Sequence, residues 1–153
     1  MHFCPIIWFA GLVALCVVLA ACLNIVVGNK AEMMNKYLAA VDLCVAEVGA
    51  STADKEDVMN DAPVTRREGK CLHACLMKKF AVMDADGKFV RAVGMEHAKM
   101  ITGGDADRMK VAIEIIDDCD SLDVSPDHCE AAVEYGACFK RQSAARGLHE
   151  FQI

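Results

Sequence analysis

Six cysteines lie between residues 44 and 138 of this chain, and thiols at such spacings can either form disulfides or bind a metal ion. They are Cys44, Cys71, Cys75, Cys119, Cys129 and Cys138. Cys71 and Cys75 are four positions apart, so on a helix they share one face and reach outward rather than toward each other. Cys129 and Cys138 are nine apart, which places them on opposite sides of a helix and predicts two different partner segments.

A zinc site is the alternative use of these thiols, because His73 lies between Cys71 and Cys75 and His128 precedes Cys129. Zinc sites built from closely spaced cysteines are typical of reducing compartments, whereas disulfides form in exported proteins. His73 lies off the helix face that the two cysteines share, and we expect it to be an exposed helical residue.

The first 28 residues contain no Asp, Glu, Lys or Arg, and the apolar run within them is long enough to cross a bilayer. Small residues at Val26 and Gly28 precede the polar Asn29. This pattern favours a signal peptide over residues 1–28, cleaved after Gly28, over a retained membrane helix. The stretch from Leu19 to Cys22 also resembles a bacterial lipoprotein box, but the segment lacks the basic start that such leaders carry.

Cleavage after Gly28 removes Cys4, Cys16 and Cys22 and leaves an even number of cysteines, as a disulfide-bonded exported domain requires. We therefore predict three disulfides in a domain over residues 29–153, with no metal and no cofactor. The full chain of 153 residues is 55% hydrophobic and carries a net charge of -6. This composition indicates one folded domain and disfavours nucleic acid as a partner.

Apolar residues after position 29 recur at intervals of three and four, and no alternating run rich in Val, Ile and Thr occurs. The pattern predicts an all-α fold of about six helices, over 31–48, 51–61, 65–86, 95–101, 105–122 and 126–145. The predicted helix starts are the capping pairs Ser51–Asp54 and Thr65–Glu68 and the dipeptide Ser125–Pro126. The helix over 105–122 has apolar residues on two adjacent faces, which predicts a central position.

The complete cysteine pattern is Cys44-x26-Cys71-x3-Cys75-x43-Cys119-x9-Cys129-x8-Cys138, and it resembles the six-cysteine signature of insect odorant-binding proteins. The x3 and x8 spacings are the specific part of this signature. The resemblance implies three interlocked disulfides, Cys44–Cys75, Cys71–Cys129 and Cys119–Cys138. It also implies that the helices surround an apolar cavity.

The function that the resemblance implies is that of a secreted carrier, not an enzyme, located in sensillar lymph or another extracellular fluid. Such a carrier binds small hydrophobic odorants or pheromones in its cavity and delivers them to an odorant receptor or a sensory-neuron membrane protein. Whether it forms a homodimer is left open. The alternative is a secreted scavenger or interaction protein of the same fold in saliva, reproductive fluid or haemolymph.

Flexible methionines and aromatic side chains suit a cavity that accepts ligands of several shapes. The predicted ligand-binding residues are Met77, Phe80, Met83, Phe89, Met95, Met100, Ile101, Met109, Ile113, Ile116, Phe139, Phe151 and Ile153. Tyr135 either offers its hydroxyl to a polar ligand head or is a capped, half-exposed tyrosine.

The carboxyl-terminal tail is apolar, and it is either a frayed end or a lid over the cavity. In the second case Leu148, Phe151 and Ile153 fold back, with His149 and Glu150 at the hinge. Protonation of His149 would then loosen the lid below neutral pH.

Two further motifs have simpler explanations than a functional site. The segment from Asp84 to Gly87 is shorter than a calcium loop and predicts a turn. Five basic residues would give the helix over 65–86 a basic face, either solvated or in contact with a receptor or lipid. They are Arg66, Arg67, Lys70, Lys78 and Lys79.

Overall fold

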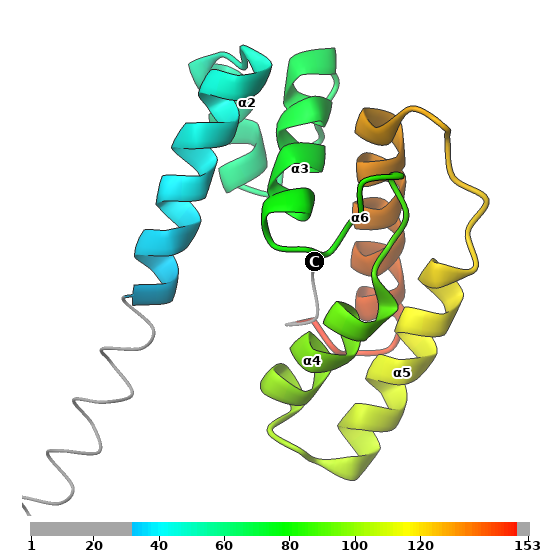
Figure 1. Cartoon of the computed structure of the whole chain (residues 1–153). Coiled ribbons are helices and arrows are strands. Elements are labelled where there is room, and N and C mark those ends of the chain that lie inside the picture. The colour runs from blue at the N-terminus through cyan, green and yellow to red at the C-terminus, as the bar shows by residue number, and fades with distance from the viewer. Residues whose placement is uncertain (1–31, 150–153) are drawn as a thin grey trace, which may run out of the picture. The chain divides into compact units, whose positions relative to one another are not determined.

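The computed structural model describes residues 32–149, so the predicted signal peptide, Phe151 and Ile153 lie outside the described residues. A helix over residues 32–48 is followed by α2 (Thr52–Met59), α3 (Arg67–Lys79), α4 (Arg91–Thr102), α5 (Ala106–Asp120) and α6 (His128–Ala145) (Figure 1). No strand occurs over 32–149, and only an isolated bridge joins Met83 to Phe89. The all-α prediction is confirmed. In the same residues, no helix has both the length and the apolar character needed to span a membrane.

The chain divides between Ala39 and Ala40 into two compact units. In the first unit, the described residues 32–39 are helical and carry an ion pair of 2.8 Å between Glu32 and Lys36. The second unit contains α2–α6, and the disulfides and core described below all belong to it. The stripe predicted along the helix over 32–48 is only partly buried, since Val41 is enclosed whereas Met34 and Leu38 are exposed.

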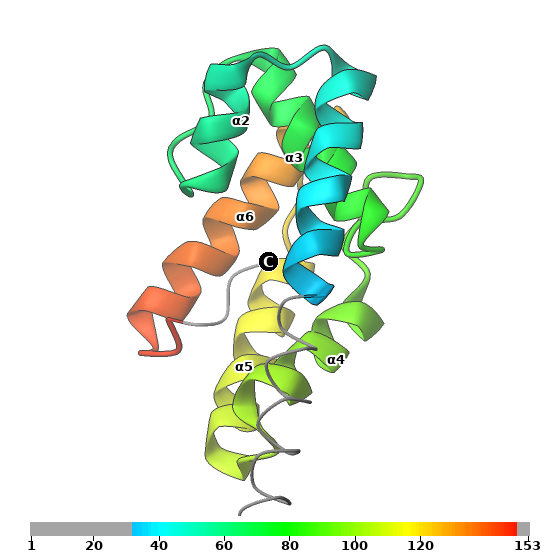
Figure 2. The same cartoon turned by 90° about the vertical axis from the view of Figure 1, so that its left-hand side faces the viewer.

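Within the second unit, α6 contacts both α3 and α5, while α2 packs on α3 and α4 packs on α5 (Figures 1 and 2). The central helix is therefore α6. The prediction of a central helix over 105–122 is wrong, because α5 buries one face only, with Ala112, Ile115 and Cys119 inside and Ile113 half-exposed.

The predicted capping box of α2 is confirmed. The Ser51 hydroxyl accepts a hydrogen bond from the Asp54 N–H at 3.2 Å, and the Asp54 carboxylate accepts one from the Ser51 N–H at 2.8 Å. Hydrogen bonds from the Ser51 hydroxyl and backbone lower the pKa of Asp54. The Arg66 guanidinium, 3.7 Å from Asp54, lowers it further. A carboxylate that is only 2% exposed is thus satisfied at the helix start.

The predicted starts of α3 and α6 are wrong. The chain is still extended at Arg66 (ψ 148°), so Thr65 lies too early to cap α3. The cap of α6 is Asp127, not Ser125, and its carboxylate accepts hydrogen bonds from the backbone N–H groups of Cys129 and Glu130. An ionised acceptor binds orphan N–H groups more strongly than a hydroxyl does, which favours Asp127 as the cap.

Between α3 and α4 the chain makes a tight turn, as predicted, rather than a calcium loop. One carboxylate oxygen of Asp84 accepts hydrogen bonds from the N–H groups of Asp86 and Lys88, both at 2.9 Å. The predicted helix ends are displaced here, because α3 stops at Lys79 and α4 already begins at Arg91. The turn delivers Phe89 to the interior.

Phe89 can be buried against α4 because the helix has a glycine, Gly94, where it passes the Phe89 ring. A Cβ at Gly94 would lie 2.5 Å from the tip of the Phe89 ring, closer than carbon atoms can approach. Gly94 therefore lets α4 pass directly over the ring.

Candidate ligand-binding interior

Three disulfides cross-link the helices of the second unit. Cys44 bonds to Cys75, Cys71 to Cys129 and Cys119 to Cys138, with S–S distances of 1.98, 2.09 and 2.03 Å. They join the helix over 32–48 to α3, α3 to α6, and α5 to α6. The pairing that the cysteine signature implied is confirmed. The zinc alternative is excluded for these cysteines, because none of their sulfurs is a free thiol.

The basic residues of α3 form ion pairs within the fold. Arg67 lies 2.8 Å from Asp127, and Lys70 lies 2.9 Å from Glu130. Lys78 Nζ donates to His128 Nδ1 at 2.7 Å. These three contacts flank the Cys71–Cys129 disulfide on the α3–α6 interface. Lys79 also pairs with Glu47, and Arg66 pairs with Asp54 and Glu68. Arg66, Arg67 and Lys79 remain exposed, as in the solvated form of the predicted basic face, and no described contact tests a receptor or lipid.

The interior of the second unit is an apolar cluster to which α3, α5, α6 and the α3–α4 turn all contribute. Its aromatic centre consists of Phe89, Tyr135 and Phe139. The ring of Phe89 lies 5.0 Å from that of Phe139 and 5.9 Å from that of Tyr135, measured between centroids. Tyr135 is 2% exposed, so its interpretation as a half-exposed residue is wrong.

Most of the predicted ligand-binding residues come together in this cluster. Five of them belong to it, namely Met77, Met83, Phe89, Ile116 and Phe139. Three more are partly buried against it, namely Met95, Ile101 and Met109. Eight residues from five different chain segments thus converge on one interior.

Three predicted residues are not in the cluster. Phe80 is 42% exposed and Met100 is 59% exposed, while Ile113 is half-buried. Phe80 falls outside because it is the residue that caps the end of α3, where the chain turns away. Ile115 and Val124 are also buried in the cluster, although neither is among the predicted ligand-binding residues. The sequence signal for Ile115 is its helical spacing of three from Ala112 and four from Cys119, which places the three on one face of α5.

At the tail, Leu148 is buried in the cluster and its N–H donates to the carbonyl of Ser143 at 3.0 Å. The next residue, His149, is exposed. The remaining residues of the predicted lid, from Glu150 onward, lie outside the described residues.

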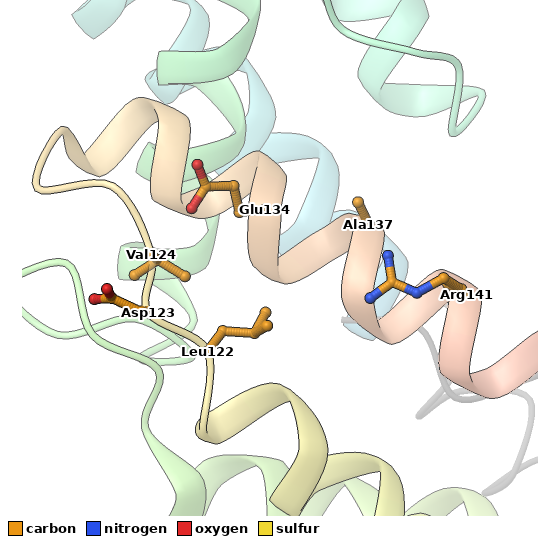
Figure 3. Close-up of a pocket in the computed structure, with 6 residues that line it drawn as sticks. All are labelled: Leu122, Asp123, Val124, Glu134, Ala137 and Arg141. Atoms are coloured by element: carbon orange, nitrogen blue, oxygen red, sulfur yellow. The ribbon is translucent and has the colours of Figure 1, made fainter.

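A separate recess of about 330 Å³ lies between α6 and the loop that follows α5 (Figure 3). Its lining is mixed, because Leu122, Val124 and Ala137 lie next to the charged Asp123, Glu134 and Arg141. The Glu134 carboxylate accepts a hydrogen bond from the Ser125 N–H at 2.9 Å. None of the predicted ligand-binding residues lines this recess, although Val124 belongs to the apolar cluster and Leu122 packs against it.

His73 is half-buried between α3 and α6, so the prediction of an exposed side chain is wrong. A Cβ at Gly136 of α6 would lie 2.7 Å from its Cε1. Burial lowers the pKa of His73, and the charge of Asp61 opposes this with a smaller effect. Burial also lowers the pKa of His97 on α4.

These two histidines predict how stability depends on pH. Since the folded state disfavours the charged imidazole, the unfolded chain binds protons at higher pH than the folded chain does. The contribution of these histidines to the free energy of unfolding should be constant above about pH 6.5 and should fall as pH drops from there to the lowered pKa, by at most about 1.4 kcal/mol per pH unit for each histidine. In urea unfolding between about pH 7.5 and 5, His73→Asn should remove part of this slope. An identical slope in the variant would contradict the burial argument.

Residues 28–142 match the model of the PBP/GOBP family. The chain belongs to this family. Among its relatives, general odorant-binding protein 28a of Drosophila melanogaster is 40% identical over 120 residues, which cover 78% of this chain and 84% of the relative. General odorant-binding protein 19d of the same fly is 34% identical over 129 residues, covering 83% and 86%. The family is one of odorant-binding carriers rather than enzymes.

Solved structures agree with this assignment. The structure of odorant-binding protein 28a from Drosophila melanogaster is 41% identical, with a TM-score of 0.67, and covers 76% of this chain and 97% of its own. A second structure, the fatty acid binding protein OBP56a from the oral disk of the blowfly Phormia regina, is 21% identical with a TM-score of 0.63. It covers 74% of this chain and 94% of its own, and at this identity it shows the fold alone.

Proposed function

We propose that the chain is a secreted carrier that binds small hydrophobic odorants or pheromones in its interior and delivers them to membrane receptors. The observation that supports it most is the convergence of eight predicted ligand-binding residues on one cluster enclosed by cross-linked helices. Disulfides contribute stability independently of how fully the core is packed, so a domain of this size can open space for a ligand and still stay folded.

The interior is chemically suited to oily ligands. Four of the eight converging residues are methionines, namely Met77, Met83, Met95 and Met109, and their unbranched thioether side chains change shape at little cost. Burial of a ligand contributes roughly 25 cal/mol per Å² of apolar surface, and about 300 Å² therefore gives roughly 7 kcal/mol before the costs of association. We expect dissociation constants on the order of micromolar and broad selectivity among apolar molecules.

Displacement of a fluorescent probe tests this proposal. The full chain is expressed in insect cells, and the product in the medium is titrated with N-phenyl-1-naphthylamine and then with apolar alcohols, ketones and esters. We expect the probe to brighten on binding and the ligands to displace it. Reduced and alkylated protein is the control, and it should lose binding because the helices are no longer held together. Equal probe binding by both forms, or none by either, would contradict the proposal.

The same material tests secretion and processing. Mass spectrometry of the protein in the medium should show a chain beginning at Asn29, with a mass six hydrogens below that of the reduced form. Protein retained in the membrane fraction with its first 28 residues intact would contradict the signal-peptide assignment.

A further inference from the structure

Tyr135 is the largest polar side chain buried in the apolar cluster. It projects from α6, is 2% exposed, and its ring lies 5.9 Å from that of Phe89. Phe89 is in the predicted ligand-binding set and its ring also packs on that of Phe139, so the Tyr135 ring adjoins a residue already expected to contact ligand.

The hydroxyl of Tyr135 differs from the other buried hydroxyls in having no partner. Within residues 32–149, no hydrogen bond joins it to another side chain or to the backbone, whereas Thr102 donates to the Lys99 carbonyl and Ser143 also has a partner. Every completely enclosed side-chain nitrogen or oxygen in that part of the chain is hydrogen-bonded. The Tyr135 hydroxyl is therefore not completely enclosed, and a small part of its surface is accessible to water.

The polar and charged side chains buried in the described chain limit the kind of ligand that fits. The buried polar or charged side chains over 32–149 are Asp54, Thr102 and Ser143, and none of them is a lysine or arginine. Asp54 is already bound at the start of α2. A carboxylate buried in the cluster would lose its hydration without gaining a cation, which is costly. A neutral oxygen needs only one donor, and Tyr135 has one.

We propose that the Tyr135 hydroxyl donates a hydrogen bond to a neutral oxygen of the ligand, as in a ketone, aldehyde, ester or alcohol. The interior thereby prefers neutral oxygen-bearing ligands to hydrocarbons of equal size and to carboxylates. This selectivity rests on the proposed carrier function and gives it a substrate class.

Three ligands with nine carbons separate the contributions. Nonane, 2-nonanone and nonanoate are each used to displace N-phenyl-1-naphthylamine from the oxidised protein at about pH 7.5. Tyr135→Phe keeps the ring and removes the hydrogen-bond donor. We expect this variant to bind 2-nonanone about three- to tenfold more weakly, and to bind nonane with an affinity within about twofold of the unaltered protein. The unaltered protein should bind 2-nonanone more tightly than nonanoate.

Thr102→Val is the matched control, because it also removes a buried hydroxyl but one that already has a partner. It should leave the ratio of the nonane and 2-nonanone affinities unchanged. The inference is overturned if Tyr135→Phe weakens the binding of nonane and 2-nonanone equally, or weakens neither. It is also overturned if the unaltered protein binds nonanoate more tightly than 2-nonanone. If nonane still displaces the probe in those cases, the carrier function stands and only the role of Tyr135 fails. If no ligand displaces the probe from unaltered protein, both fail.

Discussion

Replacing Cys71 and Cys129 together by alanine should lower the free energy of unfolding by about 4 kcal/mol. This disulfide spans 58 positions, the longest of the three separations, and the entropy that a cross-link removes from the unfolded chain grows with the length of the closed loop. Urea unfolding of the double variant and of the unaltered protein, both without reductant, measures the difference. The double replacement leaves no odd thiol to form wrong bonds.

The loop lengths also predict an order among the three disulfides. The Cys44–Cys75 pair spans 31 positions and the Cys119–Cys138 pair spans 19, so their loop contributions should be smaller, at about 3 to 4 kcal/mol. The ion pairs beside Cys71 and Cys129 are exposed or partly exposed, so water screens them and each contributes much less than the disulfide. A loss below about 1 kcal/mol for Cys71→Ala with Cys129→Ala would show that these contacts hold α3 and α6 together without the disulfide.

Phe139→Ala should destabilise the fold by about 3 to 5 kcal/mol, because it removes a completely buried ring and leaves a cavity beside Phe89. The measurement is the free energy of unfolding in urea at about pH 7.5. Phe80→Ala is the matched control, since it makes the same truncation at a ring that is 42% exposed, and it should cost clearly less. Equal losses in the two variants would contradict the assignment of Phe139 to the core.

The cross-links could be predicted from the sequence because cysteine spacing is a property of the chain itself. The helix faces predicted that Cys129 and Cys138 have different partners, and the family signature supplied the pairing, which the structure bears out. The Ser51–Asp54 capping box was equally predictable, since both of its members lie within four residues.

Features that depend on distant residues could not be predicted in this way. Asp127 caps α6 and also binds Arg67, which is sixty positions away, and the local sequence does not reveal this second contact. His73 is half-buried because Gly136 lets α6 approach it. Similarly, the last residues of the predicted third helix were misassigned because the chain turns at Ala81, with φ 56°, so that Met83 can meet Phe89.

The claim that ligands enter the interior can be tested with the methionines, which are distributed between the inside and the surface. Met77, Met83, Met95 and Met109 lie in or against the apolar cluster, whereas Met33, Met34, Met59 and Met100 are exposed. The most direct measurement is NMR of the ¹³C-labelled methionine methyl groups, assigned by single Met→Leu variants, during titration of the oxidised protein with 2-nonanone. If ligands enter the interior, the four interior methyl signals should shift saturably while the four exposed signals stay unchanged. Shifts confined to the exposed methyl groups, or no shift at concentrations where 2-nonanone displaces the probe, would contradict this claim.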